Sequence, residues 1–153
     1  MAYFPLFADL AHKPVLAVGG GMVAERKIDA LLKSEAQVQI VAHSISPTIQ
    51  AWLDEGRVMW LAAEFKPEQI DAVWLVIAAT DDQALNQDVF SAAEARHRFV
   101  NVVDNQALCH FITPALIDRS PIQIAISSGG AAPVLVRQWR ERLEALLPQH
   151  LGD

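Results

Sequence analysis

The chain has 153 residues and one cysteine, and its formal net charge at neutral pH is −6. This length corresponds to one domain with at most a short appended segment. The single cysteine, Cys109, excludes an intrachain disulfide and a multi-cysteine zinc site, and it suits a reducing cytoplasm. The negative charge argues against broad binding to nucleic acid or to an anionic membrane surface. Every apolar stretch is shorter than the ~20 residues that a membrane span requires.

Strand and helix patterns alternate from the N-terminus onward. Parallel strands are predicted at residues 14–18, 37–42, 58–61, 73–78 and 99–103, and the continuous apolar runs at 14–18 and 73–78 are typical of buried strands. Helices are expected over residues 22–34, 46–55 and 80–97, the second introduced by Ser46-Pro47 and ended by Gly56. This order predicts an α/β fold, namely a Rossmann-type doubly wound parallel sheet with helices on both faces.

The rhythm changes after the fifth strand. Residues 111–117 and 122–127 are two strand-like runs, and residues 118–121 between them have the composition of a turn. We therefore expect a hairpin-like extension of the sheet. Pro133 then opens a final helix that runs to about Leu147.

A glycine-rich turn follows the first strand. The run Gly19-Gly20-Gly21-Met22-Val23-Ala24 fits the pattern G-x-G-x-x-G/A. In that pattern Gly19 allows the tight turn, Gly21 lets the backbone approach a pyrophosphate, and Ala24 allows close packing of helix on strand. Free N–H groups at the start of the helix would face the phosphates. Because the turn lies between a buried strand and an amphipathic helix, it predicts a nicotinamide dinucleotide site; the alternative is a structural turn without a ligand.

The ends of the second and fourth strands supply further candidates. The second strand ends without the usual acid, so His43 and Ser44 are the groups that can hydrogen-bond the ribose hydroxyls. No arginine is there to hold a 2′-phosphate, which favours NAD over NADP. Thr80 follows the fourth strand, where a cofactor passes in folds of this type. The alternatives are a solvated His43 and a helix cap at Thr80 or Asp81.

Candidate chemistry follows the fifth strand. Asp104 comes directly after it and can accept a proton as hydride leaves a neighbouring carbon; the alternative is an ordinary turn aspartate. Cys109 and His110 suggest a metal, but two ligand types in one loop do not make a closed site, so no metal site is expected. The only tyrosine is Tyr3, which excludes a short-chain reductase with its Tyr-x-x-x-Lys pair.

A second glycine-rich turn precedes the last helix. Ser127-Ser128-Gly129-Gly130 presents hydroxyls and backbone N–H groups, which suit the carboxylates of a substrate. Cations lie nearby in the sequence at Arg119, Arg137 and Arg140, for which a solvated helix face is the alternative.

Taken together, these motifs resemble the siroheme-synthase family of precorrin-2 dehydrogenases and sirohydrochlorin ferrochelatases. The matching segments are residues 4–7, 18–27, 78–82, 101–104, 111–114, 117–121 and 127–135. The resemblance implies two reactions at one site: NAD takes a hydride from precorrin-2 to give sirohydrochlorin, and ferrous iron is then inserted to give siroheme. It implies that Asp104 serves as general base and as the chelatase group.

The resemblance also assigns binding residues and a partner. It places dinucleotide contacts at Met22, Val23, His43 and Ser44, and a tetrapyrrole cleft at Asn101, Thr113, Ser127, Ser128 and Gly129. A phosphate on Ser128 would repel that anionic substrate. The family further implies a cytoplasmic homodimer, with an NAD-binding part at about 1–113 and the start of a substrate and dimerisation segment at about 114–153. The alternative function is a non-catalytic NAD-sensing module.

Overall fold

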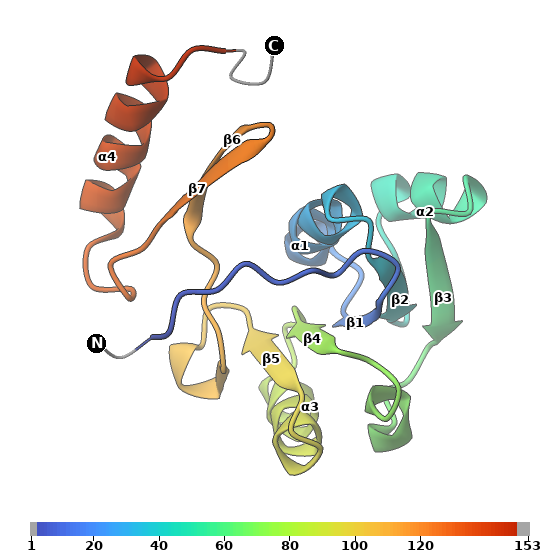
Figure 1. Cartoon of the computed structure of the whole chain (residues 1–153). Coiled ribbons are helices and arrows are strands. Elements are labelled where there is room, and N and C mark those ends of the chain that lie inside the picture. The colour runs from blue at the N-terminus through green and yellow to red at the C-terminus, as the bar shows by residue number, and fades with distance from the viewer. Residues whose placement is uncertain (1–2, 150–153) are drawn as a thin grey trace. The chain divides into compact units, whose positions relative to one another are not determined.

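The computed structural model describes residues 3–149. They form two compact units. The sheet unit is Leu6–Phe111, and the hairpin unit joins the residues up to Pro5 to the chain from Ile112 onward. In chain order the elements are β1 (Pro14–Val18), α1 (Met22–Lys33), β2 (Gln37–Val41), α2 (Pro47–Asp54), β3 (Val58–Ala62), the 3₁₀ helix η1 (Pro67–Ile70), β4 (Leu75–Ala78), α3 (Gln83–Ala95), β5 (Phe99–Val102), the 3₁₀ helix η2 (Gln106–Leu108), β6 (Ala115–Arg119), β7 (Ile122–Ile126) and α4 (Pro133–Leu146) (Figure 1).

The sheet unit contains a five-stranded parallel sheet in the order β3-β2-β1-β4-β5, so the predicted fold class is confirmed. Val18 at the end of β1 pairs with both Val41 and Ala78, and Ala78 pairs with Val102. The carboxyl ends of four strands are therefore level. The strand order reverses between β1 and β4, and the crevice beyond such a reversal is where ligands bind in open α/β sheets.

Helices cover both faces of this sheet because its central strands are apolar on both sides. On one face, Val15 and Ala17 of β1 pack with Ile28 of α1 and Ile49 of α2. On the other face, Leu16 and Val18 of β1 pack with residues of α3 and of the η1 segment. Ala24 is 1% exposed, and its small side chain lets α1 approach the sheet closely.

Within the sheet unit, two elements start two or more residues later than the sequence predicts. Strand β4 begins at Leu75 rather than at residue 73, because η1 continues into a turn in which the Val73 N–H bonds to the Ile70 carbonyl. Helix α3 begins at Gln83 with Asp82 as its N-cap, and the Asp82 side chain accepts a hydrogen bond from the Leu85 N–H. The residues at 80 and 81 are left as a loop at the carboxyl edge of the sheet.

In the hairpin unit, β6 and β7 form the expected antiparallel pair, but they make a separate two-stranded sheet rather than an extension of the parallel one. The turn between them is also shorter than predicted. Asp118 pairs with Gln123 and Arg119 with Ile122, so only Ser120 and Pro121 lie between the strands. The prediction of a turn over 118–121 was wrong because polar side chains on an exposed strand resemble turn composition. The first strand also starts later, at Ala115, since Phe111 packs against the core of the sheet unit.

Candidate functional site

The glycine turn after β1 is fixed by contact with the loop after β4. Gly19 has φ +123°, a conformation that L side chains rarely adopt, and a Cβ there would lie 2.3 Å from the Ala79 carbonyl oxygen. The Ala79 N–H in turn donates to the Val18 carbonyl at 2.8 Å. Gly19 therefore allows two loops to touch at the point where the strand order reverses, as the motif predicts.

Gly20 lies equally close to the loop after β2. A Cβ at Gly20 would lie 2.1 Å from the Ser44 carbonyl oxygen, and the Gly20 carbonyl accepts from the Ser46 N–H at 2.8 Å. The Ser46 hydroxyl also donates to the Glu25 carboxylate in the first turn of α1 at 2.7 Å. The sequence motif treats the position of Gly20 as variable, so this requirement for glycine was missed.

Gly21 differs from both neighbours because a Cβ there would meet nothing within 4 Å. It is the N-cap of α1, and no side chain of the described residues caps this helix start. Backbone N–H groups of the first turn, including those of Met22 and Val23, have no partner within the helix. An open space in front of free N–H groups at a helix N-terminus fits the pyrophosphate of a dinucleotide.

The other cofactor candidates lie around this opening with different surroundings. His43 and Ser44 are exposed in the loop after β2, where both side chains are accessible to a ribose. Thr80 is half-buried, and its hydroxyl lies 2.7 Å from the Asn86 side-chain oxygen and 3.1 Å from the Asp82 carbonyl. Thr80 thus braces the start of α3, while Asp82 caps it.

Asp104 follows β5 and is exposed. Its φ of +62° is in the left-handed region, which a residue other than glycine seldom adopts and which costs on the order of 1 kcal/mol. The turn is fixed on both sides, because the Val103 N–H bonds to the Ala78 carbonyl and the Asn105 N–H to the Val102 carbonyl. The backbone bonds therefore fix the main chain at Asp104, and with it the direction of its Cα–Cβ bond at the carboxyl edge.

The loop after Asp104 folds back along β5. Asn101 is 7% exposed, and its side-chain amide donates to the Phe111 carbonyl at 2.9 Å. Asn101 and Cys109 form an isolated antiparallel bridge. The Cys109 thiol is half-buried, 3.2 Å from the Val102 and Asn105 carbonyls, and burial raises its pKa.

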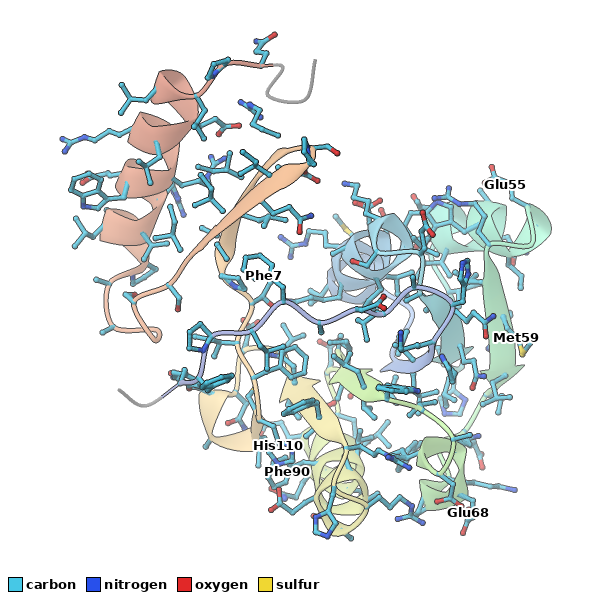
Figure 2. All side chains as sticks on the ribbon, in the orientation of Figure 1. Phe7, Glu55, Met59, Glu68, Phe90 and His110 are labelled. Carbon is cyan, nitrogen blue, oxygen red and sulfur yellow. The ribbon has the colours of Figure 1, made fainter. Side chains whose placement is uncertain are left out.

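His110 anchors the end of the same loop to α3. Its Nδ1 lies 3.0 Å from the Arg98 carbonyl, its Nε2 contacts the Glu94 carboxylate, and its ring packs against Phe90 at 5.4 Å between centroids (Figure 2). Since both ring nitrogens are engaged, His110 holds the loop in place. Among residues 3–149, no three His, Cys, Asp or Glu side chains gather as a metal-binding group.

Lys27 is a charged residue of this region that lies in the matching segment 18–27 but was assigned no role from the sequence. It lies in the second turn of α1 and is half-buried. Burial lowers its pKa, and the electrostatic attraction of Asp104, followed by that of Cys109, opposes this. Its partial burial could have been inferred from its spacing in the sequence. Lys27 follows Ala24 by three residues and so lies at the border of the buried helix face.

In the hairpin unit, the second glycine-rich turn is closed by its own serines. The Ser127 hydroxyl accepts from the Gly129 N–H at 3.0 Å, and the Ser128 hydroxyl accepts from the Ala132 N–H at 2.9 Å. Gly129 has φ +65°, and a Cβ there would reach the Tyr3 ring at 3.5 Å. Each serine keeps its O–H proton for donation to a ligand.

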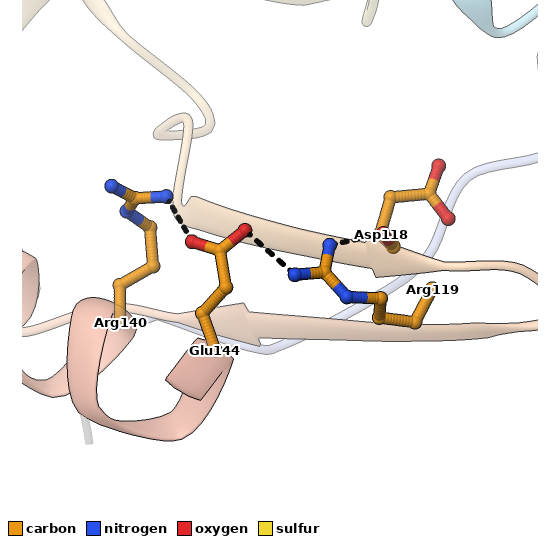
Figure 3. A network of polar contacts seen from close by, with 4 residues as sticks. All are labelled: Asp118, Arg119, Arg140 and Glu144. Atoms are coloured by element: carbon orange, nitrogen blue, oxygen red, sulfur yellow. Dashed lines mark hydrogen bonds and ion pairs between the residues drawn. The ribbon is translucent and has the colours of Figure 1, made fainter. Parts of the chain in front are cut away.

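The candidate arginines of the hairpin unit are not equivalent. Arg119 and Arg140 both contact the Glu144 carboxylate, at 3.1 and 2.8 Å (Figure 3). Arg137 is exposed on α4, and Thr113 is exposed just before β6. The structure therefore gathers two of the three predicted cations around one acid, and Arg137 is not part of that contact.

Comparison with known proteins agrees with these features. A family model described as "Putative NAD(P)-binding" matches residues 6–115, and one described as "Sirohaem biosynthesis protein central" matches residues 119–146. Siroheme synthase of Mannheimia succiniciproducens is 59% identical over 99% of this chain, and siroheme synthase 1 of Yersinia enterocolitica is 58% identical over 100%. The chain spans 32% of the length of each of these two relatives.

A solved structure is also similar. The structure described as "SirC, precorrin-2 dehydrogenase" has 28% sequence identity and a TM-score of 0.83, covering 96% of this chain and 72% of its own. In the described part of the chain, none of the helices is long and apolar enough to cross a membrane. The resemblance expected from the motifs is confirmed, and the chain belongs to the family of NAD(P)-binding domains that siroheme synthases contain.

Proposed function

We propose that this chain catalyses NAD-dependent dehydrogenation of precorrin-2 to sirohydrochlorin, and that the same site then inserts ferrous iron to give siroheme. The proposal is supported by the relatives named siroheme synthase and by the similar structure described as a precorrin-2 dehydrogenase. The single observation that carries it is the strained Asp104, in the same unit as an open glycine turn suited to a dinucleotide.

The sheet unit would hold the cofactor. Met22 and Val23 offer backbone N–H groups to the pyrophosphate, and the side chains of His43 and Ser44 offer hydrogen bonds to the ribose. Thr80 would line the cofactor site after β4. When bound there, NAD would supply the acceptor for the hydride that leaves the substrate carbon.

Asp104 would take the proton in both reactions. In the first, the Asp104 carboxylate would accept the proton that the substrate loses together with a hydride, so that the two-electron oxidation balances. In the second, the iron substrate replaces two pyrrole N–H protons, and the carboxylate accepts one while solvent takes the other. Asn101 fixes the loop beside Asp104 through its bond to Phe111.

The hairpin unit would bind the carboxylates of the tetrapyrrole. Hydroxyl protons of Ser127 and Ser128, the backbone at Gly129, and the side chains of Thr113 and Arg137 are the proposed contacts. Arg119 would contribute while remaining paired with Glu144. The net charge of −6 falls entirely on the sheet unit, since acids and bases balance from Ile112 onward, so an anionic substrate is repelled less by the hairpin unit.

A homodimer is part of the proposal. Helix α4 has no buried residue over Pro133–Leu146, although a helix in a globular protein normally buries one face. Large apolar side chains of the hairpin unit are exposed, namely Leu116 49%, Ile122 46%, Val134 65%, Leu135 52%, Trp139 47% and Leu146 79%. A second copy of the chain would cover them. The lone cysteine is in keeping with a cytoplasmic protein.

The test is anaerobic incubation with precorrin-2 and NAD, followed by NADH absorbance and by the sirohydrochlorin spectrum, then addition of ferrous iron. Asp104→Asn, which keeps the side-chain shape, is expected to lower both rates by about 10²-fold or more while the Kd for NAD stays within about twofold. Asp88→Asn, an exposed aspartate of α3, is the matched control. Loss of only one reaction refutes a shared site, and a dimer that binds NAD without turnover supports the NAD-sensing alternative.

A further inference from the structure

Ser46 bonds the loop after β2 to the glycine turn and to α1. The Ser46 N–H donates to the Gly20 carbonyl at 2.8 Å, and the Ser46 hydroxyl donates to the Glu25 carboxylate at 2.7 Å. The same hydroxyl accepts from the Ile49 N–H at 3.2 Å, as the N-cap of α2. One residue therefore joins the glycine turn, the first turn of α1 and the loop that precedes α2.

Glu25 brings a negative charge to this junction. It is the acid in the first turn of α1, and the first turn of α2 has none. Glu25 is half-buried, and no salt bridge within residues 3–149 includes it. Arg26 is exposed and lies about 200° around the helix axis from the buried Ala24, so it extends to solvent. Because the Ser46 hydroxyl is neutral, the charge of the Glu25 carboxylate is not cancelled.

This charge lies beside the segment on which a ribose would rest. In folds of this type the adenine ribose binds at the end of the second strand, where an acid normally contacts its hydroxyls. Here β2 is followed by Ala42, His43 and Ser44, so that acid is missing. Ser44 is two residues before Ser46, and its carbonyl oxygen would lie 2.1 Å from a Cβ on Gly20. The Glu25 carboxylate is thus one hydrogen bond away from the loop that carries the ribose candidates.

NADP differs from NAD by a phosphate on the 2′-oxygen of this ribose. That group carries about two negative charges at neutral pH. Repulsion between like charges is stronger where water is partly excluded, as it is around the half-buried Glu25. The 2′-hydroxyl of NAD is neutral and is not repelled.

We propose that Glu25 makes the cofactor site selective for NAD over NADP, because it supplies from α1 the negative charge that the end of β2 lacks. Ser46 is the positioning residue, since its hydroxyl holds the Glu25 carboxylate at the glycine turn. This inference rests on the proposed function for the placement of the adenine ribose beside the loop after β2.

The first experiment measures binding in the absence of substrate. Calorimetric titration gives the Kd for NAD and the Kd for NADP with the wild type, Glu25→Gln, Glu25→Ala and the matched control Asp29→Asn. Asp29 lies one turn further along α1 and pairs with Lys33, so its variant removes one negative charge from the same helix away from Ser46. The readout is the Kd for NADP divided by the Kd for NAD, because a disturbed fold weakens both ligands together.

The wild type is expected to bind NAD at least about tenfold more tightly than NADP. Both neutral variants of Glu25 should lower the Kd ratio at least about fivefold, while Asp29→Asn leaves it within about twofold. Glu25→Asp keeps the charge and should keep most of the ratio. Since salt screens charge repulsion, a higher ionic strength should lower the ratio more in the wild type than in Glu25→Gln.

Three results overturn the proposal. The first is a wild-type Kd ratio near one. The second is an unchanged ratio in the neutral variants, and the third is an equal loss of affinity for both dinucleotides, which is the result of a purely structural role. Thermal unfolding shows which variants fold. Glu25→Gln keeps the side-chain shape and an oxygen for the Ser46 hydroxyl, so it decides the matter where Glu25→Ala fails to fold.

The second experiment tests the positioning role of Ser46 by the same ratio. Ser46→Ala removes the donor to Glu25 and should lower the Kd ratio by about twofold or more, though less than Glu25→Gln does. Ser46→Thr keeps the hydroxyl and should restore the ratio. A wild-type ratio in Ser46→Ala, or a failure of threonine to restore it, overturns the positioning role.

The two proposals fail in different ways. A wild type that binds NAD selectively but does not oxidise precorrin-2 refutes the proposed function, while the Kd ratio still decides the role of Glu25. Turnover of precorrin-2 together with an unchanged ratio in the neutral variants refutes the role of Glu25 alone. A wild type that binds neither dinucleotide refutes both.

Discussion

Adjacent glycines of the cofactor turn should respond to alanine in opposite ways. At Gly20 a Cβ would lie 2.1 Å from the Ser44 carbonyl oxygen and 3.0 Å from the Ala42 Cβ, so the backbone must shift. We expect Gly20→Ala to lower the free energy of unfolding by about 2–4 kcal/mol, as for other overpacked sites. For a chain of this size that lowers Tm by roughly 5–15 °C.

At Gly21 the same methyl group meets nothing within 4 Å, and the backbone angles of φ −86° and ψ −170° are open to alanine. Gly21→Ala should therefore change the free energy of unfolding by no more than about 1 kcal/mol, mainly through a weaker helix cap. The methyl group would occupy the space proposed for the pyrophosphate. We expect a loss of NAD affinity of about 10- to 100-fold, or ~1.4–2.8 kcal/mol.

Both variants are measured without cofactor by thermal unfolding and with NAD by calorimetric titration. Gly20→Ala serves as the control for stability, and Gly21→Ala isolates the cofactor effect. Wild-type NAD affinity in Gly21→Ala would refute the assignment of this turn as the pyrophosphate site. Wild-type stability in Gly20→Ala would refute the close approach of the turn after β1 to the loop after β2.

Three further predictions follow from contacts described above. Asn101→Ala should lower the free energy of unfolding in urea by about 1–3 kcal/mol, since it leaves the Phe111 carbonyl without its buried donor, whereas the exposed Asn105→Ala should not. Because burial raises the pKa of Cys109, its alkylation should reach half-maximal rate at a higher pH in the folded chain than in urea; equal midpoints would contradict this. Trp139→Glu should convert the proposed dimer to a monomer in light scattering, while Gln138→Glu leaves it intact.

The sheet unit was predictable because its signals are local and repeated. Mainly apolar segments followed by small or polar residues recur along the sheet unit, and the glycine motif marks the turn after the first strand. The hairpin turn was misjudged because Asp118 and Arg119 point to a strand only through their pairing with Gln123 and Ile122, which is contact between different parts of the chain. Local composition carries no information on such pairing.

The site was predicted by position rather than by environment. Asp104 could be identified because it follows a buried strand, but its left-handed backbone could not. Lys27 was missed since half-burial and attraction to Asp104 both depend on how α1 and β5 come together. The pairing of Arg119 and Arg140 with one carboxylate likewise depends on the packing of α4 against β6.

The left-handed turn at residue 104 allows folding and chemistry to be separated by mutational scanning. Glycine and asparagine adopt φ near +62° at little cost, whereas valine and isoleucine do not, so a library sorted by cellular abundance should retain the first pair and lose the second. A library sorted by siroheme production should retain aspartate alone. The difference between the two selections at this position measures what the carboxylate contributes beyond the shape of the turn.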